Sequence, residues 1–209
     1  MQIELILSFL LASVLLTFMP GPDNIFVLTE SITKGQKNGI AISIGLCTGV
    51  LIHTLAAATG LSIVIQKSAL AFSIIKYLGA AYLFYLAYMA TKEKPMEVTL
   101  GKKSKEETFK LFLLIRKGFL MNVLNPKVSL FFIAFLPQFI SQDGINITVQ
   151  MIILGLIFMV QALVIFSLIS ILSSRLTGYV NSAKFWKITK WSKVIVLSIL
   201  GLTLALSGK

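Results

Sequence analysis

The sequence predicts an all-α membrane protein that crosses the bilayer six times. Three observations support this: a shortage of charge, six apolar stretches and a one-sided distribution of basic residues. Of 209 residues, 56% are hydrophobic and only 13% are charged, and the mean hydropathy is +0.90. A soluble domain carries about 25% charged residues. A chain of this size must still present a large surface to its surroundings, so we expect much of that surface to face lipid.

Six apolar stretches are long enough to cross the hydrocarbon core, which takes about 20 residues per helix. The first stretch is not interpreted as a cleaved signal peptide, because it carries Glu4 in place of a basic start and runs into Pro20. The last stretch is the shortest and needs Trp191 to reach the interface. The expected spans cover residues 3–29, 40–65, 69–90, 118–140, 145–172 and 194–206.

Lysine and arginine gather on one side of this six-span arrangement. Fifteen of the 19 basic residues fall in the connections between spans 1 and 2, 3 and 4, and 5 and 6. Basic loops stay in the cytoplasm, so the positive-inside rule places both termini outside the cytoplasm. A five-span or seven-span chain would scatter these charges over both sides. We therefore interpret the net charge of +11 as a determinant of topology and not as a nucleic-acid-binding surface.

The chain divides into two near-equal parts around a hydrophilic segment. Residues 1–91 and 118–209 each hold three expected spans, and residues 92–117 form a cytoplasmic linker rich in Lys and Glu. Because three is odd, the halves would lie in the membrane with opposite orientations, an arrangement that recurs in transporters. A weak echo between Phe18-Met19-Pro20 and Phe135-Leu136-Pro137 agrees with this. We expect one transporter domain made of two inverted three-helix halves, with broken first and fourth helices.

Several function classes lack their characteristic residues. The one cysteine, Cys47, leaves no disulfide or CxxC pair, and a single histidine with scattered acids gives no metal-ligand cluster. The sequence has no phosphate loop, dinucleotide fingerprint or nucleophile elbow. We therefore expect no enzyme activity, no cofactor and no metal site, and any transport would draw its energy from a gradient or a partner. Homo-oligomer formation stays open.

The proline-bearing break in the first span is the first candidate site. A proline lacks an N–H and clashes with the carbonyl four residues earlier, so Pro20 and Pro22 free the carbonyls of Leu16 and Phe18. Gly21 between them permits a tight turn. In hydrocarbon, freed carbonyls must face protein or a wet cavity. The alternative is that the two prolines only kink the inner end of the span.

Two polar residues follow this break. We expect Asp23 or Asn24 to cap a new half-helix, whose N-terminus carries partial positive charge and suits a substrate carboxylate. Both residues lie in the inner part of the span, beside the freed carbonyls. They join Pro20, Gly21 and Pro22 as candidate substrate-binding or ion-binding residues.

The break in the fourth span carries the second candidate cluster. Pro126 frees the carbonyl of Asn122, and Asn125 and Lys127 stand beside it. Two amides and an ammonium next to a free carbonyl can hold a zwitterion or an anion. An ion pair between Asp23 and Lys127 would link the two broken helices and lower the cost of burying each charge. The alternative is that Lys127 extends to the cytoplasmic interface.

His53 is the third candidate, because a titratable side chain near the middle of a span is costly. Histidine exchanges protons near neutral pH, so His53 can serve as a proton relay. Gly45, Gly49 and His53 recur every four residues and share one helix face, where the glycines let another helix approach. The alternative is a neutral histidine that is hydrogen-bonded across this seam. Gln161, in the middle of the fifth span, is a lesser polar candidate.

Five short blocks of sequence carry a resemblance to a known family. They are Pro20-Gly21-Pro22; Gly45-Leu46-Cys47-Thr48-Gly49 with His53; Lys76 with Gly79-Ala80-Ala81-Tyr82-Leu83; Asn122 with Leu124-Asn125-Pro126-Lys127; and Leu136-Pro137-Gln138-Phe139. The blocks appear in this order and cover most of the chain. Together they resemble the LysE/RhtB family of bacterial amino-acid exporters.

The resemblance implies an inner-membrane efflux carrier for amino acids or close derivatives that is driven by proton exchange. The bilayer, a small-molecule substrate and protons are then its partners. The chain departs from the family at Asp23, where the family commonly has Asn; the added carboxylate would favour a cationic substrate or supply a proton site. Our leading hypothesis is a secondary exporter that binds its substrate between spans 1 and 4. The alternative is an exporter of metal or other cations with similar architecture.

Overall fold

The computed structural model describes residues 2–93, 109–141, 144–180 and 182–207, and these residues form helices joined by short connections. No strand occurs among them. The elements in chain order are α1 (Ile3–Phe18), α2 (Pro22–Lys34), α3 (Gln36–Ala56), the π-helical turn η1 (Ala57–Leu61), α4 (Ser62–Lys67), α5 (Ala69–Lys92), α6 (Phe109–Val123), α7 (Pro126–Leu130), the π-helical turn η2 (Phe131–Phe135), the 3₁₀ turn η3 (Leu136–Phe139), α8 (Ile147–Val180) and α9 (Ala183–Leu206).

Four helical stretches of the described chain are long and apolar enough to cross a membrane alone, namely Gln36–Val64, Ala69–Lys92, Ile147–Ser173 and Ala183–Leu206. Two further helix pairs pass the same test together but are sharply bent. Ile3–Phe18 meets Pro22–Lys34 at 58°, and Leu111–Val123 meets Pro126–Phe139 at 48°. With each bent pair counted as one span, the described residues contain six. The chain is therefore a polytopic helical membrane protein whose first and fourth spans are broken at the prolines.

Two helices begin earlier than the sequence predicts. The fourth span was expected from residue 118, but α6 already starts at Phe109, and α9 starts at Ala183 instead of residue 194. The predicted spans ended where lysines interrupt the apolar sequence. A helix can continue through a lysine whose aliphatic stem packs on the bundle. In α9, Lys193 is only 7% exposed. The lysine-rich turns therefore belong to the helices and not to the loops.

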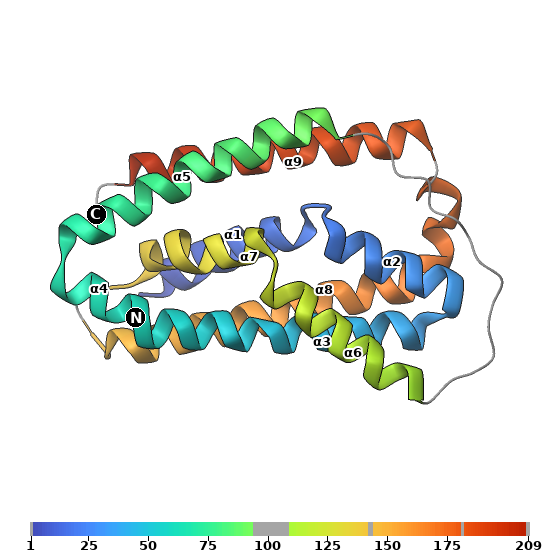
Figure 1. Ribbon diagram of the computed structural model, residues 1–209, viewed down its shortest axis with the longest axis horizontal. Helices are drawn as coiled ribbons and strands as arrows, with labels where there is room; N and C mark the ends of the chain where they lie inside the picture. The colour runs from blue at the N-terminus through green and yellow to red at the C-terminus, as the bar shows by residue number, and fades with distance from the viewer. Residues whose placement is uncertain (1, 94–108, 142–143, 181, 208–209) are drawn as a thin grey trace.

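The helices run roughly parallel to one long axis; α1, α2 and α7 lie in the middle of the view, and α6 lies along α3 at its lower edge (Figure 1). Helices α5 and α9 lie side by side along one face (Figure 1). Helix α3 packs on α6 and α8, and α8 in turn packs on α1 and α2. The broken span of each half therefore packs on the middle span of the other half: span 4 contacts span 2, and span 1 contacts span 5. Two inverted halves are expected to pack in this reciprocal way. The boundary at residues 92–117 lies largely outside the described residues and stays a prediction.

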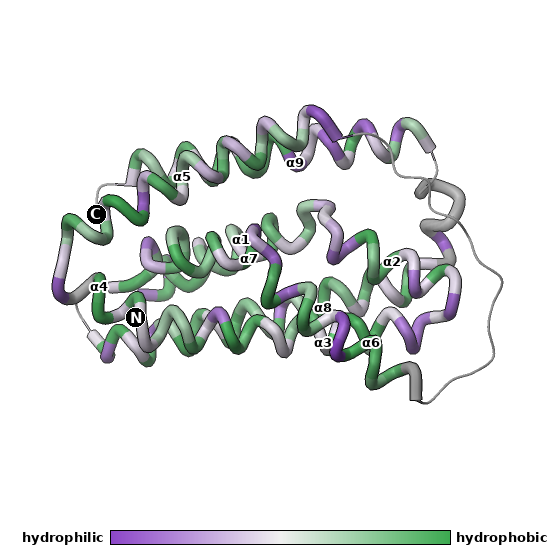
Figure 2. Tube along the Cα trace, in the orientation of Figure 1, coloured by the Kyte–Doolittle hydropathy of each residue, from purple (hydrophilic) through white to green (hydrophobic). Residues whose placement is uncertain are grey.

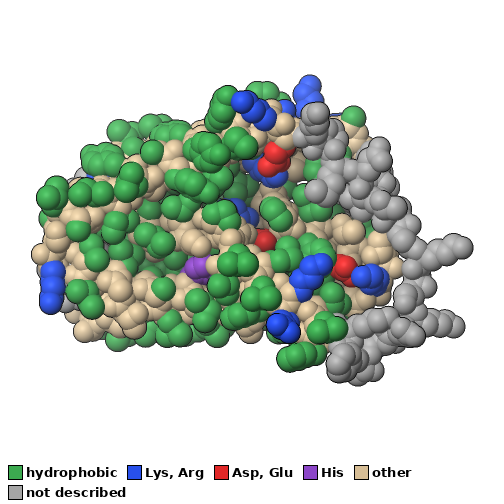
Figure 3. Space-filling view, viewed as in Figure 1, with side chains coloured by type: hydrophobic (Ala, Val, Ile, Leu, Met, Phe, Trp, Pro, Cys, Tyr) green, Lys and Arg blue, Asp and Glu red, His purple; other side chains and the backbone are tan. Residues whose placement is uncertain are grey.

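Apolar side chains cover much of the outer surface (Figure 3), as a lipid-facing protein requires. Leu70 on α5 and Leu206 on α9, for example, are more than 70% exposed. Hydropathy is high along the helices and falls toward the end where α2 stops and α9 begins (Figure 2). Lysine and arginine side chains also gather toward that end in the face that Figure 3 shows. We call it the basic end, and the end near α4 the opposite end.

A seam of glycines sets how closely α3 and α6 approach. A Cβ atom at Gly45 would collide with the backbone carbonyl of Ile115, and one at Gly118 would collide with the backbone carbonyl of Ile42. Gly49 faces the side chain of Asn122 in the same way. The predicted glycine face of the second span is confirmed, and its partner is α6, the first part of the broken fourth span.

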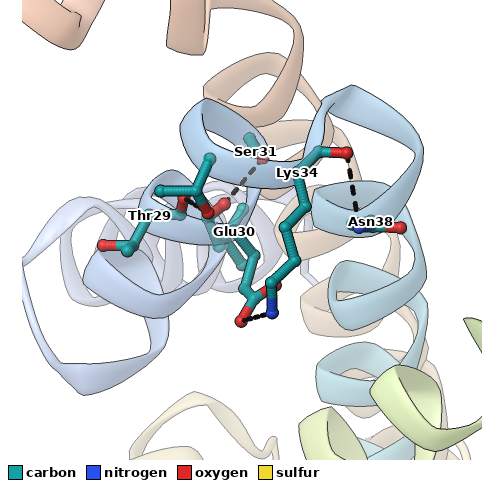
Figure 4. Close-up of polar contacts among 7 residues, drawn as sticks. Thr29, Glu30, Ser31, Lys34 and Asn38 are labelled. Carbon is teal, nitrogen blue, oxygen red and sulfur yellow. Dashed lines mark hydrogen bonds and ion pairs between the residues drawn. The ribbon is translucent and has the colours of Figure 1, made fainter. Parts of the chain in front are cut away.

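The corner between α2 and α3 fixes the second half of the broken first span. Gly35 adopts a positive φ of 97° at this corner, a conformation that suits glycine. Lys34 pairs with Glu30 at 2.9 Å, and Asn38 reaches back to the carbonyl of Lys34 (Figure 4). The Ser31 hydroxyl donates to Ser170 on α8 at 3.0 Å. Helix α2 is thereby tied to both α3 and α8.

The glycine seam predicts a stability difference between two alanine substitutions. Gly45→Ala should lower the melting temperature in detergent, because overpacking against a backbone typically costs about 1–3 kcal/mol. That exceeds the gain of about 1 kcal/mol from removing a helical glycine. Gly60→Ala is the matched control, since its Cβ would meet nothing within 4 Å. Equal melting temperatures, followed by tryptophan fluorescence, would contradict the close approach of α6.

Candidate functional site

The two broken spans face each other at their breaks. Asn125, at the start of α7, donates a 2.5 Å hydrogen bond from its side-chain amide to the carboxylate of Asp23 in the first turn of α2. Both residues are buried, and Asp23 is only 2% exposed. The contact joins residues 102 apart in the sequence. The candidate residues from the two halves therefore form one cluster in the interior.

Lys127 crosses from one break to the other. Its ammonium donates to the backbone carbonyls of Leu16 at 3.3 Å and Met19 at 3.5 Å, at the end of α1. The carbonyl of Leu16 is one that Pro20 was predicted to free. Lys127 is 9% exposed, so the alternative in which it extends to the interface is wrong. Its positive charge instead satisfies the negative end of the α1 dipole.

A direct ion pair between Asp23 and Lys127 was expected and is not found. The ion pairs of 4 Å or less within the described chain lie elsewhere. Asp23 is engaged by an amide, and Lys127 by backbone carbonyls. Both charged groups nevertheless line the same small cavity. The two charges thus compensate across that cavity without contact, because each has found a hydrogen-bonding partner of its own.

The capping of the half-helices also differs from prediction. Helix α2 begins with Gly21 as its N-cap and Pro22 in the first position, with no side-chain cap, so the expected cap by Asp23 or Asn24 is wrong. The Asn24 amide instead donates to the Thr17 carbonyl of α1 at 2.8 Å. A true side-chain cap occurs at the other break, where the Asn125 oxygen accepts from the backbone N–H of Lys127 at 3.0 Å.

His53 reaches the second freed carbonyl. Its Nε2 lies 3.1 Å from the backbone oxygen of Asn122, the carbonyl that Pro126 was predicted to release. Since a carbonyl only accepts, Nε2 carries the hydrogen of this bond. The backbone N–H of Asn125 shares the same acceptor at 2.9 Å. His53 therefore lies at the end of the glycine seam, and the contact matches the alternative of a histidine hydrogen-bonded across it.

A cavity of about 10 Å³ lies between the breaks. Thr17 and Asp23 line it from the first span and Asn122 and Lys127 from the fourth. Apolar side chains of α3 and α8 close the rest of its wall. We call it the central cavity. It has room for about one water-sized group, so the site is closed around its polar residues.

A much larger hollow of about 640 Å³ opens on the basic side of the breaks. We call it the vestibule. Most of its wall is apolar, and the Lys117 ammonium lies 4.1 Å above the ring of Phe26. Lys193 and Glu93 form an ion pair of 2.5 Å in its wall. Its lining comprises Pro22, Ile25, Phe26, Thr29, Glu93, Lys117, Met121, Trp186 and Lys193.

Aromatic rings fill the space on the other side of the central cavity. Phe158 lines the cavity and packs on Phe131 and Phe132, with ring centroids 5.5 and 5.3 Å apart. Phe9 of α1 packs on Phe131 and on Phe139, at 5.7 and 5.4 Å. These rings come from α1, η2, η3 and α8 and form one packed cluster. The described structure is therefore hollow on the basic side of its breaks and packed on the opposite side.

Sequence reasoning missed or underrated several residues of this region. Thr17 was not singled out, and Gln161 was rated a lesser candidate, yet the Gln161 amide donates to the Thr17 hydroxyl at 2.9 Å. Lys193 was assigned to a loop but lies in α9, where it pairs with Glu93, which follows the end of α5. The signal for Lys193 was a charged residue at helical spacing beside an apolar run.

Comparison with known proteins decides the family. The model of the LysE type translocators matches residues 14–208 of this chain. The chain belongs to the LysE type translocators. The match covers both breaks and all five sequence blocks, so the resemblance inferred from those blocks is confirmed. No solved structure matches this LysE type translocator.

Individual relatives of this LysE type translocator are similar over nearly their whole length. An uncharacterized membrane protein of Bacillus subtilis is 32% identical over 208 residues, which is 97% of this chain and 99% of the relative. A homoserine/homoserine lactone efflux protein of Salmonella typhimurium is 31% identical over 190 residues, which is 90% of this chain and 89% of the relative. A leucine efflux protein of the same organism is 27% identical over 178 residues, which is 85% of this chain and 82% of the relative.

The arrangement of Asp23 and Lys127 predicts non-additive stability effects in this translocator. Asp23→Asn and Lys127→Met should each lower the melting temperature, because each leaves the other charge buried alone. The double variant should be less destabilised than the sum of the two, by about 0.5–3 kcal/mol. Lys67→Met is the control partner, since Lys67 is exposed on α4. Additivity of Asp23→Asn with Lys127→Met would contradict compensation across the central cavity.

Proposed function

We propose that this translocator is a secondary exporter of amino acids or their derivatives across the bacterial cytoplasmic membrane, and that it exchanges them for protons. One observation carries the proposal. Two broken spans meet around a small polar cavity that holds a buried carboxylate and a buried ammonium, with a hollow on one side and packed rings on the other. The printed names of two relatives, for homoserine and leucine efflux, support amino acids as the substrate class.

The basic end is assigned to the cytoplasm. Fifteen of the 19 Lys and Arg residues fall in the connections on that side, and the positive-inside rule retains such loops in the cytoplasm. Both termini then lie outside. The vestibule opens to the cytoplasm in this orientation, which is the side from which an exporter loads.

Loading follows from the chemistry of the vestibule and the cavity. A substrate carboxylate is attracted to Lys117 in the vestibule wall, and apolar parts of the substrate pack on Phe26 and Trp186. The central cavity is too small for a whole amino acid. Binding therefore requires the bond between Asp23 and Asn125 to open, so that the substrate head group can reach Asp23 and Lys127.

Export then requires the two halves to rock about the breaks. The phenylalanine cluster separates and the vestibule closes, in the manner of other inverted-repeat carriers. Proton exchange is assigned to His53, whose ring contacts the break through the carbonyl of Asn122. A second proton site at Asp23 is compatible with its position beside the cavity.

Transport by the purified protein tests this function. Proteoliposomes should show counterflow of a labelled amino acid from a panel that includes leucine and homoserine, and an imposed pH gradient should drive net transport. His53→Gln should keep counterflow and lose at least about tenfold of the pH-driven component. His53→Gln with unchanged pH coupling would remove His53 as the relay. Wild-type vesicles that carry none of the panel would refute the proposed function.

Reporter fusions test the orientation. A reporter joined after Lys103 should be active only in the cytoplasm, and one joined after Lys209 only outside it, because the positive-inside rule retains the basic loops. Activity is read in intact cells with a paired cytoplasmic and periplasmic reporter. Both fusions on the same side would overturn the six-span topology.

A further inference from the structure

Three buried amide oxygens beside the central cavity have no hydrogen-bond donor within the described chain. They are Asn24 Oδ1, Asn122 Oδ1 and Gln161 Oε1. The three side chains are 8%, 3% and 9% exposed. Buried polar atoms in folded proteins almost always have a hydrogen-bond partner, because an unpaired atom loses its hydration free energy without a compensating bond. Asn122 lines the central cavity, and Asn24 and Gln161 bond to Thr17 in its wall, so these unpaired oxygens indicate that a donor from outside the chain belongs near the cavity.

The hydrogen bonds of the neighbouring atoms fix the orientation of two of these amides. The Asn24 nitrogen donates to the carbonyl of Thr17, which can only accept. The Thr17 hydroxyl uses its hydrogen on the carbonyl of Ser13 at 2.8 Å, so it must accept from the Gln161 nitrogen. Neither amide can be turned around without losing a bond. The free atoms of Asn24 and Gln161 are therefore oxygens.

Thr17 brings these acceptors together at the wall of the central cavity. Asn24 and Gln161 both bond to Thr17, and Thr17, Asn122 and Asp23 line the cavity. The Thr17 hydroxyl keeps one lone pair unused after its two bonds. The carboxylate of Asp23 adds negative charge. Thr17, Asp23 and Asn122 thus place acceptor groups on the cavity, with Asn24 and Gln161 directly behind Thr17, and the cavity has room for about one water-sized group.

We propose that this wall is a subsite for a primary ammonium group, and specifically for the amino group of the exported molecule. An ammonium has three N–H donors and no acceptor, so it can pair with Asp23 and two of the free oxygens at once. A single water donates only twice, so it cannot pair with Asp23 and two of these oxygens at once. This inference rests on the proposed function, because it assigns one end of the substrate to named residues.

Charge favours an amino acid over a metal cation as the source of the positive group. The cavity already holds one negative and one positive group, Asp23 and Lys127. A sodium ion would leave the buried site with a net positive charge, which is costly in the membrane interior. A zwitterion keeps the site neutral, with its ammonium on the oxygen wall and its carboxylate toward the Lys127 ammonium. The subsite therefore requires both an amino group and a carboxylate on the same molecule.

A cycle of variants and ligands tests the subsite. The labelled amino acid that wild-type proteoliposomes carry is competed with its unlabelled form and with the 2-hydroxy acid of the same side chain. Gln161→Met should weaken competition by the amino acid about tenfold, as loss of a charge-assisted hydrogen bond does. Competition by the hydroxy acid should change less than about twofold, because it carries no ammonium. Gln161→Glu, which keeps the oxygen, should retain the preference for the amino acid.

Controls separate the outcomes. Gln138→Met repeats the substitution in η3, away from the cavity, and should leave both competitions unchanged; Asn24→Leu is the second variant if Gln161→Met does not fold. Equal weakening of amino and hydroxy acid would overturn the subsite and leave the exporter function standing. Stabilisation of the wild type by sodium over choline chloride, abolished in Gln161→Met, would assign the wall to a metal cation instead. Failure of wild-type transport would refute the exporter function and the substrate assignment with it.

Discussion

The rest of this structure depends on carbonyl groups that prolines free inside a membrane. A helix in hydrocarbon satisfies its own backbone, and a proline prevents this at one carbonyl four residues earlier. Here the carbonyl of Leu16 is bound by the ammonium of Lys127, and that of Asn122 by the ring of His53. Each partner comes from a different span. The breaks therefore hold the bundle together at the same place where they open a polar interior.

Close packing at glycines allows a side chain of one span to reach a backbone carbonyl of another. The seam of Gly45, Gly49 and Gly118 brings α6 against α3 so closely that His53 can reach the backbone of the fourth span. Larger residues would hold the helices apart and leave the carbonyl of Asn122 with one bond fewer. The same closeness carries Asn125 toward Asp23 in the first span. The position of the site thus depends on the glycines of the seam as much as on its polar side chains.

The two sides of the breaks differ in packing, and this difference gives the site a direction. The basic side has a vestibule of about 640 Å³ with an apolar wall and a lysine at its rim. The opposite side is filled by phenylalanine rings of α1, η2, η3 and α8. Bent spans with irregular turns such as η2 and η3 can repack at a small energetic cost, since fewer regular hydrogen bonds have to break. Such an arrangement suits a carrier that alternates between two states.

The class of the protein and the positions of its two breaks follow from local features of the sequence. The length of an apolar stretch, the charge of a loop and the position of a proline are local properties. Their structural effects can be predicted without knowing which helices pack together. The sequence also identified Asp23, Asn125, Lys127 and His53, because polar groups in apolar runs stand out. Span ends were less well predicted, since α6 and α9 extend through basic residues that lower the mean hydropathy, and Lys193 of α9 is buried.

The pairing of these polar groups, in contrast, depends on how the helices pack. Lys127 was expected to pair with Asp23 but binds the end of α1 instead, because the carbonyls of Leu16 and Met19 offer its buried ammonium acceptors within 3.5 Å. Thr17 and Gln161 carry no sequence signal, as a threonine or a glutamine in a span is common, and their meaning appears only when α1 and α8 meet. Composition and periodicity specify each helix separately. Which acceptors are left without donors depends on how the helices pack, and that is where the ammonium subsite arises.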